Sequence, residues 1–211
     1  LIGAALLTFT AGSLSACSSD ETLALPPEET LDPGERLIEG DCDPLVPTQC
    51  GFPFPSNVLA REDPSSPTKL RVAFGPTTLP KTSASPNPTD PAPWNDSDGF
   101  SPGGSAITHI PGATIEGLPT QDTLDLSLSP DSPTVLLDAE TLERVPHFAE
   151  LDMSTNDDDD RTFIIRPVVR LKDNTRYIVA IRRVKDAGGK ALPPSPVFKA
   201  LRDGTRYVQE D

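Results

Sequence analysis

The sequence predicts a mainly β protein, an antiparallel sandwich of short strands joined by long, irregular, proline-rich loops. The 25 prolines are scattered along the 211 residues, which disfavours long helices because proline removes a helix hydrogen bond. After residue 104, short runs of alternating apolar and polar residues return at intervals of about 10–12 residues. Several short strands at that spacing are typical of an antiparallel sandwich.

The first predicted strand covers residues 68–74. Every second residue from Leu70 to Phe74 is apolar, which is the pattern of a half-buried strand, and a Gly-Pro pair ends the run. Residues 75–104 are rich in Pro, Ser, Thr, Asn and Asp and predict a long irregular connection. So long a connection inside a compact domain is usually functional or packed as a flap. We expect Trp94 to anchor it by packing.

Alternating patterns predict further strands in the second half of the chain. On residues 161–166, Phe163 and Ile165 share one face of the predicted strand. Residues 139–141 are expected to form the turn of a hairpin. A short helix is expected to begin at Val197. The predicted strands cover residues 105–110, 124–128, 134–138, 142–145, 161–166 and 175–184.

An uncharged apolar run opens the chain and ends in Leu14-Ser15-Ala16-Cys17. Residues 1–16 are typical of the apolar region and processing site of a secretory signal peptide. No Lys or Arg precedes the run, so the signal is expected to be truncated at its start. The run is also shorter than the roughly 20 residues that a membrane-spanning helix needs. The alternative is a buried core helix, although no amphipathic face is visible.

Residues 18–41 predict an acidic, disordered tether. The segment holds three prolines, and Arg36 is its single basic residue, so an extended and solvated chain is favoured. Such a segment holds a folded part clear of a membrane surface; the alternative is a disordered tail without that role. Its acidic residues are Asp20, Glu21, Glu28, Glu29, Asp32, Glu35, Glu39 and Asp41.

The net charge of −14 argues against a nucleic-acid partner, because phosphates are repelled and their binding needs clustered Lys and Arg. It also argues against electrostatic docking on anionic lipid. If the protein is held at a membrane, a covalent lipid is therefore the expected means of attachment.

Of the three cysteines, Cys42 and Cys50 remain as a pair if Cys17 is modified. In an exported protein two nearby cysteines are expected to form a disulfide. Closing so short a loop stabilises the fold by about 2 kcal/mol. The alternative is a metal site, but the two histidines, His109 and His147, are distant in sequence.

No complete catalytic constellation is predicted, and no catalytic or cofactor-binding residue is assigned. Ser105 follows two glycines, but Ile107 stands where a nucleophile elbow needs its last glycine, which favours a turn leading into a strand. His109 lies four residues further along that strand, too distant to share a proton with Ser105. We expect His109 and His147 to be surface or packing residues.

No cofactor is expected, and calcium is the alternative, because two stretches of the sequence are rich in side-chain oxygens of the kind that bind calcium. Residues 95–99 combine Asn, Asp and Ser oxygens with a glycine but lack the spacing of an EF-hand. Residues 157–160 are four consecutive aspartates, which cannot all point at one ion. The second stretch is expected to be a solvated loop between two strands, and no metal site is assigned.

The tetrapeptide that ends at Cys17 resembles the bacterial lipobox. The resemblance implies that Cys17 is lipidated and becomes the first residue of the mature protein. Ser18 and Ser19 follow it with no Asp at the next position, which in Gram-negative lipoproteins is associated with sorting to the outer membrane. The implied location is the bacterial cell envelope, with the lipid as the attachment to the outer membrane.

Residues 42–55, Cys-Asp-Pro-Leu-Val-Pro-Thr-Gln-Cys-Gly-Phe-Pro-Phe-Pro, are similar to the start of a group of large secreted bacterial proteins. These resemble the bacterial virulence-factor lipases, in which a β-rich N-terminal domain precedes an α/β-hydrolase domain. Residues 171–180, followed by 185–189, look like the penultimate strand and turn of bacterial Ig-like domains. Further matching stretches are residues 98–103, 135–138, 143–146 and 149–152.

These resemblances imply an Ig-like sandwich that serves as the non-catalytic N-terminal module of a surface-anchored lipoprotein and braces a downstream esterase or lipase domain. No triad position is matched in this chain, so no catalytic residue is carried over. The alternative is a self-contained Ig-like binding or adhesion module at the cell surface. The expected divisions are a signal peptide (1–16), the lipidated cysteine and tether (17–41), the β domain (42–203) and the start of a following segment that is cut (204–211).

Overall fold

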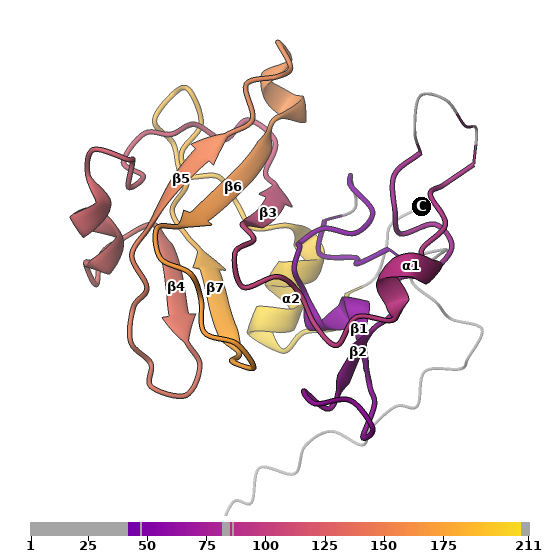
Figure 1. Cartoon of the computed structure of the whole chain (residues 1–211). Helices are drawn as coiled ribbons and strands as arrows, with labels where there is room; N and C mark the ends of the chain where they lie inside the picture. The colour runs from indigo at the N-terminus through magenta and orange to yellow at the C-terminus, as the bar shows by residue number, and fades with distance from the viewer. Residues whose placement is uncertain (1–41, 47, 82–84, 86, 208–211) are drawn as a thin grey trace, which may run out of the picture. The chain divides into compact units, whose positions relative to one another are not determined.

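The computed structural model describes residues 42–46, 48–81, 85 and 87–207. The predicted signal peptide, Cys17 and the tether therefore lie outside the described residues. The prediction of a mainly β protein with antiparallel strands and few helices is confirmed. In chain order the elements are β1 (Ala60–Glu62), β2 (Leu70–Val72), α1 (Ala92–Asn95), β3 (Ala106–His109), β4 (Thr134–Asp138), β5 (His147–Leu151), β6 (Thr162–Pro167), β7 (Tyr177–Ile181) and α2 (Pro196–Asp203) (Figure 1). Short 3-10 segments cover Asn57–Leu59, Leu124–Leu128 and Asp158–Asp160.

The strand β6 is the centre of a three-stranded antiparallel sheet, with β3 and β5 on either side (Figure 1). Ile165 on β6 lies opposite Ala106 on β3 and Ala149 on β5. Phe163 and Ile165 are 0% and 1% exposed, as their shared face predicts. The buried cluster on this face also includes Ala113, Leu118, Ala149 and Val184.

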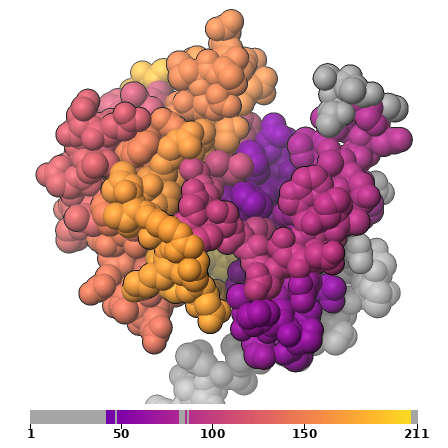
Figure 2. All heavy atoms as spheres, viewed as in Figure 1, coloured from indigo at the N-terminus to yellow at the C-terminus, as the bar shows by residue number. Residues whose placement is uncertain are grey.

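A second antiparallel sheet consists of β4 and β7. Leu136 on β4 is buried and lies opposite Val179 on β7, which is half-exposed. The predicted hairpin after β4 is present, because the N–H of Val145 donates to the carbonyl of Leu136 at 2.8 Å. In Figure 2 the orange part of the chain lies at the surface, and Ile178, Val179 and Ala180 of β7 are exposed.

An aromatic cluster and one asparagine hold the long connection 75–104 against β2. The rings of Phe54, Phe74 and Phe100 lie with centroids 5.1 to 6.4 Å apart. In α1, the Asn95 side chain accepts from the N–H of Phe74 at 2.8 Å and donates to its carbonyl at 2.9 Å. Trp94 is 46% exposed, so its predicted anchoring role is wrong, and Asn95 and Phe100 fill it.

The predicted strand over residues 124–128 is wrong, because this stretch forms a 3-10 helix. Its buried residue is Ser127, while Leu126 and Leu128 are about half-exposed. The Ser127 hydroxyl donates to the carbonyl of Leu124 at 2.6 Å. This local bond offers the backbone an alternative to a strand ladder, which the leucine alternation does not reveal.

The predicted short helix near Val197 is confirmed as α2. The Ser195 hydroxyl accepts from the N–H of Phe198 and caps its start, and Pro196 stands at the first helical position, where its missing N–H costs nothing. The helix ends at Gly204, whose φ of 64° is the left-handed conformation that glycine tolerates.

Candidate functional site

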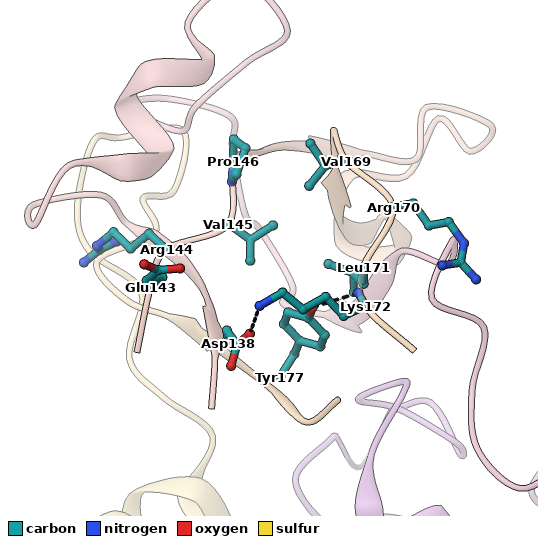
Figure 3. Close-up of a pocket in the computed structure, with 10 residues that line it drawn as sticks. All are labelled: Asp138, Glu143, Arg144, Val145, Pro146, Val169, Arg170, Leu171, Lys172 and Tyr177. Atoms are coloured by element: carbon teal, nitrogen blue, oxygen red, sulfur yellow. Dashed lines mark hydrogen bonds and ion pairs between the residues drawn. The ribbon is translucent and has the colours of Figure 1, made fainter. Parts of the chain in front are cut away.

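A pocket of about 150 Å³ lies where the end of β4, the following hairpin and the segment before β7 meet (Figure 3). Its central charged group is Asp138, which is 4% exposed. The Lys172 ammonium donates to Asp138 Oδ2 at 2.8 Å. The backbone N–H groups of Glu140 and Thr141 donate to Oδ1 at 3.0 and 3.2 Å. The Tyr177 hydroxyl accepts from the N–H of Lys172 at 2.9 Å.

These partners make the Asp138 carboxylate a structural group. The hydrogen bond from Lys172, followed by those from the backbone, lowers the pKa of Asp138, and the same pairing raises the pKa of Lys172. A carboxylate held ionised by bonds to both oxygens is a weak proton acceptor. The pair therefore ties the segment before β7 to the end of β4. Sequence reasoning missed it; the available signal is the aspartate at the first position of a turn.

The structure does not pair Ser105 with His109. The Ser105 hydroxyl accepts from Arg166 at 3.3 Å. His109 is buried, and its Nε2 lies 2.6 Å from the Asp159 carbonyl. A carbonyl can only accept, so Nε2 donates to it, and Nδ1 is hydrogen-bonded to the Thr48 hydroxyl at 2.6 Å. His109 thus joins β3 to the loop that contains Thr48 and to the 3-10 segment Asp158–Asp160, and is a packing residue, as expected.

His147 is also a packing residue and is fully buried. Its Nδ1 donates to the Val145 carbonyl at 2.8 Å, and its Nε2 accepts from the Thr134 hydroxyl at 2.9 Å. Its backbone N–H donates to Ser127 at 3.2 Å. The residue therefore connects β4, β5 and the 3-10 segment Leu124–Leu128. Burial lowers the pKa of His147 below 6.5, with a smaller contribution from the charge of Arg144.

This lowered pKa predicts that the fold loses stability in mild acid. The neutral ring is the form that the fold favours, so its contribution is complete above the unfolded pKa of 6.5 and is lost as pH falls through the folded pKa. His147→Gln is expected to cost about 1–3 kcal/mol at pH 7.5, because buried partners are left unpaired. Melting curves at pH 7.5 and 5.5 should show a smaller acid-induced drop in the variant. An equal fall in melting temperature for both proteins would show that a group other than His147 causes the acid sensitivity.

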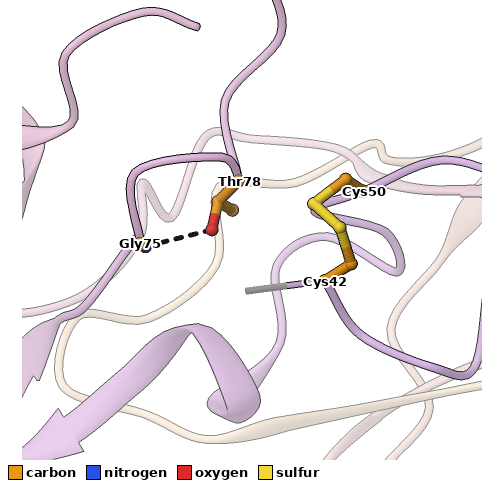
Figure 4. The surroundings of a disulfide bond; sticks show 4 residues. All are labelled: Cys42, Cys50, Gly75 and Thr78. Atoms are coloured by element: carbon orange, nitrogen blue, oxygen red, sulfur yellow. Dashed lines mark hydrogen bonds between the residues drawn. A yellow bond between two sulfur atoms is a disulfide. The ribbon is translucent and has the colours of Figure 1, made fainter. Parts of the chain in front are cut away.

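The structure joins Cys42 to Cys50 in a disulfide, as the sequence predicts (Figure 4). Gly51 follows with a φ of 85°, and a Cβ atom there would lie 3.0 Å from the carbonyl oxygen of Thr78. The turn that contains Thr78 is held by its hydroxyl, which accepts from the N–H of Gly75 at 3.0 Å. A glycine after the second cysteine therefore lets the disulfide loop approach this turn closely.

Asp43 is buried beside this disulfide, at 1% exposure. Its Oδ1 accepts from the N–H of Leu45 at 2.9 Å, while its Oδ2 is buried and has no hydrogen-bond partner within the described part of the chain. Burial raises the pKa of Asp43 above 3.8, and the bond from Leu45 offsets this in part.

Asp43→Asn is expected to raise the melting temperature at pH 7, because it removes a buried negative charge and keeps an acceptor for Leu45. Since the pKa of Asp43 is raised, the cost of its charge is absent below pH 3.8 and grows as pH rises through the folded pKa. The gain should therefore disappear near pH 3.5. Asp43→Ala, which also loses the acceptor, is the control. A gain that does not depend on pH would contradict this account.

The two oxygen-rich stretches have structural partners. The carbonyl of Ser97 accepts from the N–H of Val72 at 2.9 Å. Asp157 caps the 3-10 segment Asp158–Asp160 by accepting from the N–H of Asp159 at 3.0 Å, and Asp158 pairs with Arg161 at 2.6 Å. Among the residues that the structure describes, no group of three or more His, Cys, Asp or Glu side chains is placed to hold a metal ion.

Comparisons with protein-family models, with curated proteins and with solved structures gave no match to this chain. In the described ranges, no helix has the length and apolar character to cross a bilayer.

Proposed function

We propose that this chain is the non-catalytic N-terminal module of a lipoprotein of the bacterial outer membrane, and that it braces a downstream esterase- or lipase-type hydrolase domain. The observation that carries the proposal is the use of both histidines. His109 and His147 are the residues that a serine hydrolase would need as a base, and both rings are buried with each nitrogen engaged by a packing partner.

The disulfide supports the proposed location. Cys42–Cys50 belongs to the kind of crosslink that persists in oxidising compartments such as the bacterial periplasm. Cys17 is the proposed lipid-bearing residue, and the acidic residues from Asp20 to Asp41 are the proposed tether. Together they give an exported module held to the membrane by its N-terminus.

The proposed fold is an Ig-like sandwich. The antiparallel sheets β3–β6–β5 and β4–β7 are consistent with two layers of short strands. The turn that follows β7 is closed by Asp186, whose carboxylate accepts from the N–H groups of Gly188 and Lys190, both at 2.9 Å. This is the turn that resembles the one in bacterial Ig-like domains.

Exposed apolar side chains on α2 support the bracing role. Phe198 and Leu201 are 45% and 68% exposed. A helix with large apolar residues at positions i and i+3 presents them on one face, and such faces mark interfaces between domains or proteins. A downstream domain packed against this face would bury them.

Labelling the full-length gene product with a fluorophosphonate tests the proposal. This reagent reacts with activated serines, and mass spectrometry then locates the modified residue. We expect one labelled serine outside residues 42–207, together with hydrolysis of a short-chain p-nitrophenyl ester. Label on Ser105 would make this module catalytic and overturn the proposal. A full-length product that neither reacts nor hydrolyses esters would favour the self-contained binding module.

A further inference from the structure

The strand β7 has one edge paired with β4 and one edge open. The register places Ile178 opposite Leu137 and Ala180 opposite Val135. At the two ends of the ladder, the carbonyl of Arg176 accepts from Ala139 and the N–H of Arg182 donates to Pro133. Even-numbered residues of β7 therefore point their backbone groups at β4.

The odd-numbered residues Tyr177, Val179 and Ile181 consequently point their N–H and C=O groups away from β4. None of these backbone groups is hydrogen-bonded to another residue in the part of the chain that is described. Natural edge strands are usually protected by a charge, a proline or a bulge. The sequence of β7, Tyr-Ile-Val-Ala-Ile, contains none of these.

The side chains and surroundings of β7 leave room for another strand. Ile178 and Val179 are 42% and 40% exposed. Tyr177, Val179 and Ile181 line a cleft of about 1720 Å³. A cleft of this size can accept an extended segment, and the open backbone edge can pair with it by β-strand addition.

The basic residues in the sequence that flanks β7 favour an acidic segment as the added strand. Twelve of the 18 basic residues lie within residues 161–206, against three of the 32 acidic ones, although the whole chain is acidic. Arg176 precedes β7, is exposed, and forms no ion pair with any described residue. Arg182 follows β7 and donates to the carbonyls of Ser132 and Pro130. Arg183 donates to the Asp131 carbonyl at 2.6 Å and lies 3.9 Å from the Asp131 carboxylate, so it is turned toward residue 131.

We propose that the open edge of β7 binds an extended acidic segment of a partner protein as an added strand. The backbone groups of Tyr177, Val179 and Ile181 pair with the segment, and the exposed Arg176 binds its carboxylates. A peptide fits this edge better than another polyanion, because a peptide backbone supplies alternating donors and acceptors. This inference does not depend on the proposed hydrolase.

Fluorescence anisotropy with the intact protein tests the proposal. The probe is an eight-residue peptide with two aspartates at each end and alternating valine and threonine between them. Two matched peptides serve as controls: one carries lysines in place of the aspartates, and the other is N-methylated at every residue, so neither of its edges can donate hydrogen bonds to β7. We expect each control peptide to bind at least about tenfold more weakly than the acidic probe.

Substitutions in and next to β7 test the same proposal from the side of the protein. Val179→Pro removes an outward N–H and leaves the ladder with β4 intact, since proline is tolerated where the N–H faces away from the sheet. It should weaken binding about tenfold, whereas Val179→Thr, which keeps the N–H, should change it less than about twofold. Arg176→Glu should weaken binding of the acidic probe and strengthen that of the lysine peptide. Melting curves establish that each variant is folded.

Three results would overturn the proposal. Equal binding of the N-methylated and unmodified acidic peptides would reduce the interaction to charge alone. Absence of binding by the acidic probe to the folded protein would remove it. Concentration-dependent dimerisation in analytical ultracentrifugation that Val179→Pro abolishes would make a second copy of this chain the occupant.

Discussion

Replacing Cys17 by serine is expected to move the protein from the membrane fraction to the soluble fraction. A thioether-linked lipid on this residue is the proposed attachment, and acyl chains contribute roughly 0.8 kcal/mol for each buried methylene. The net charge of −14 offers no second attraction to an anionic membrane. The loss should therefore be nearly complete. Fractionation of cells that produce the full-length precursor, with a clickable palmitate analogue as a lipid label, provides the measurement.

Ser18→Ala is the matched control, because it changes a neighbouring residue and leaves the cysteine in place. It should keep both the label and the membrane association. Retention of the Cys17→Ser protein in the membrane fraction after a high-salt wash would show that another segment holds it there. The proposed anchor would then be wrong.

Phe163→Ala is expected to have the largest effect on folding. Phe163 is 0% exposed on the central strand of the three-stranded sheet and packs in the cluster with Ile165 and Leu118. Truncating such a ring leaves a cavity and typically costs about 3–5 kcal/mol. Because natural domains are stable by only about 5–15 kcal/mol, the variant should unfold at a much lower urea concentration.

Phe198→Ala is the control for Phe163→Ala, since the Phe198 side chain on α2 is 45% exposed. Its effect on stability should stay within about 0.5 kcal/mol. Equilibrium unfolding in urea, followed by circular dichroism, measures both. Similar losses for the two variants would contradict the placement of the core on β6.

A strand could be predicted from the sequence where its alternating apolar residues are also the buried ones. On β6, Phe163 and Ile165 alternate with less buried residues, so the pattern reports the face directly. On β5 the buried positions are His147 and Ala149, while Phe148 is only partly buried, so hydrophobicity does not mark the strand. In the stretch from Leu124 to Leu128 the alternating leucines predict a strand that does not form. The buried residue of this 3-10 segment is Ser127, which a hydrophobic pattern does not mark.

The site was predictable where its partners are close in sequence. Cys42 and Cys50 are separated by 8 positions, and an oxidising compartment was inferred independently. The partners of His147 are not local: the hydroxyl of Thr134 is 13 residues away and that of Ser127 is 20 away. Such contacts arise from how β4 and β5 pack, which residue patterns along the chain do not encode.

The central claim is that this module braces a hydrolase without taking part in its chemistry. The most direct measurement compares thermal inactivation of ester hydrolysis by the full-length product with that of a variant in which residues 42–207 are deleted. We expect both proteins to hydrolyse the ester at 25 °C with similar rates. The deletion variant should inactivate about fivefold faster on heating for each 1 kcal/mol of lost interface energy. Equal half-lives, or loss of hydrolysis at 25 °C on deletion, would contradict the account.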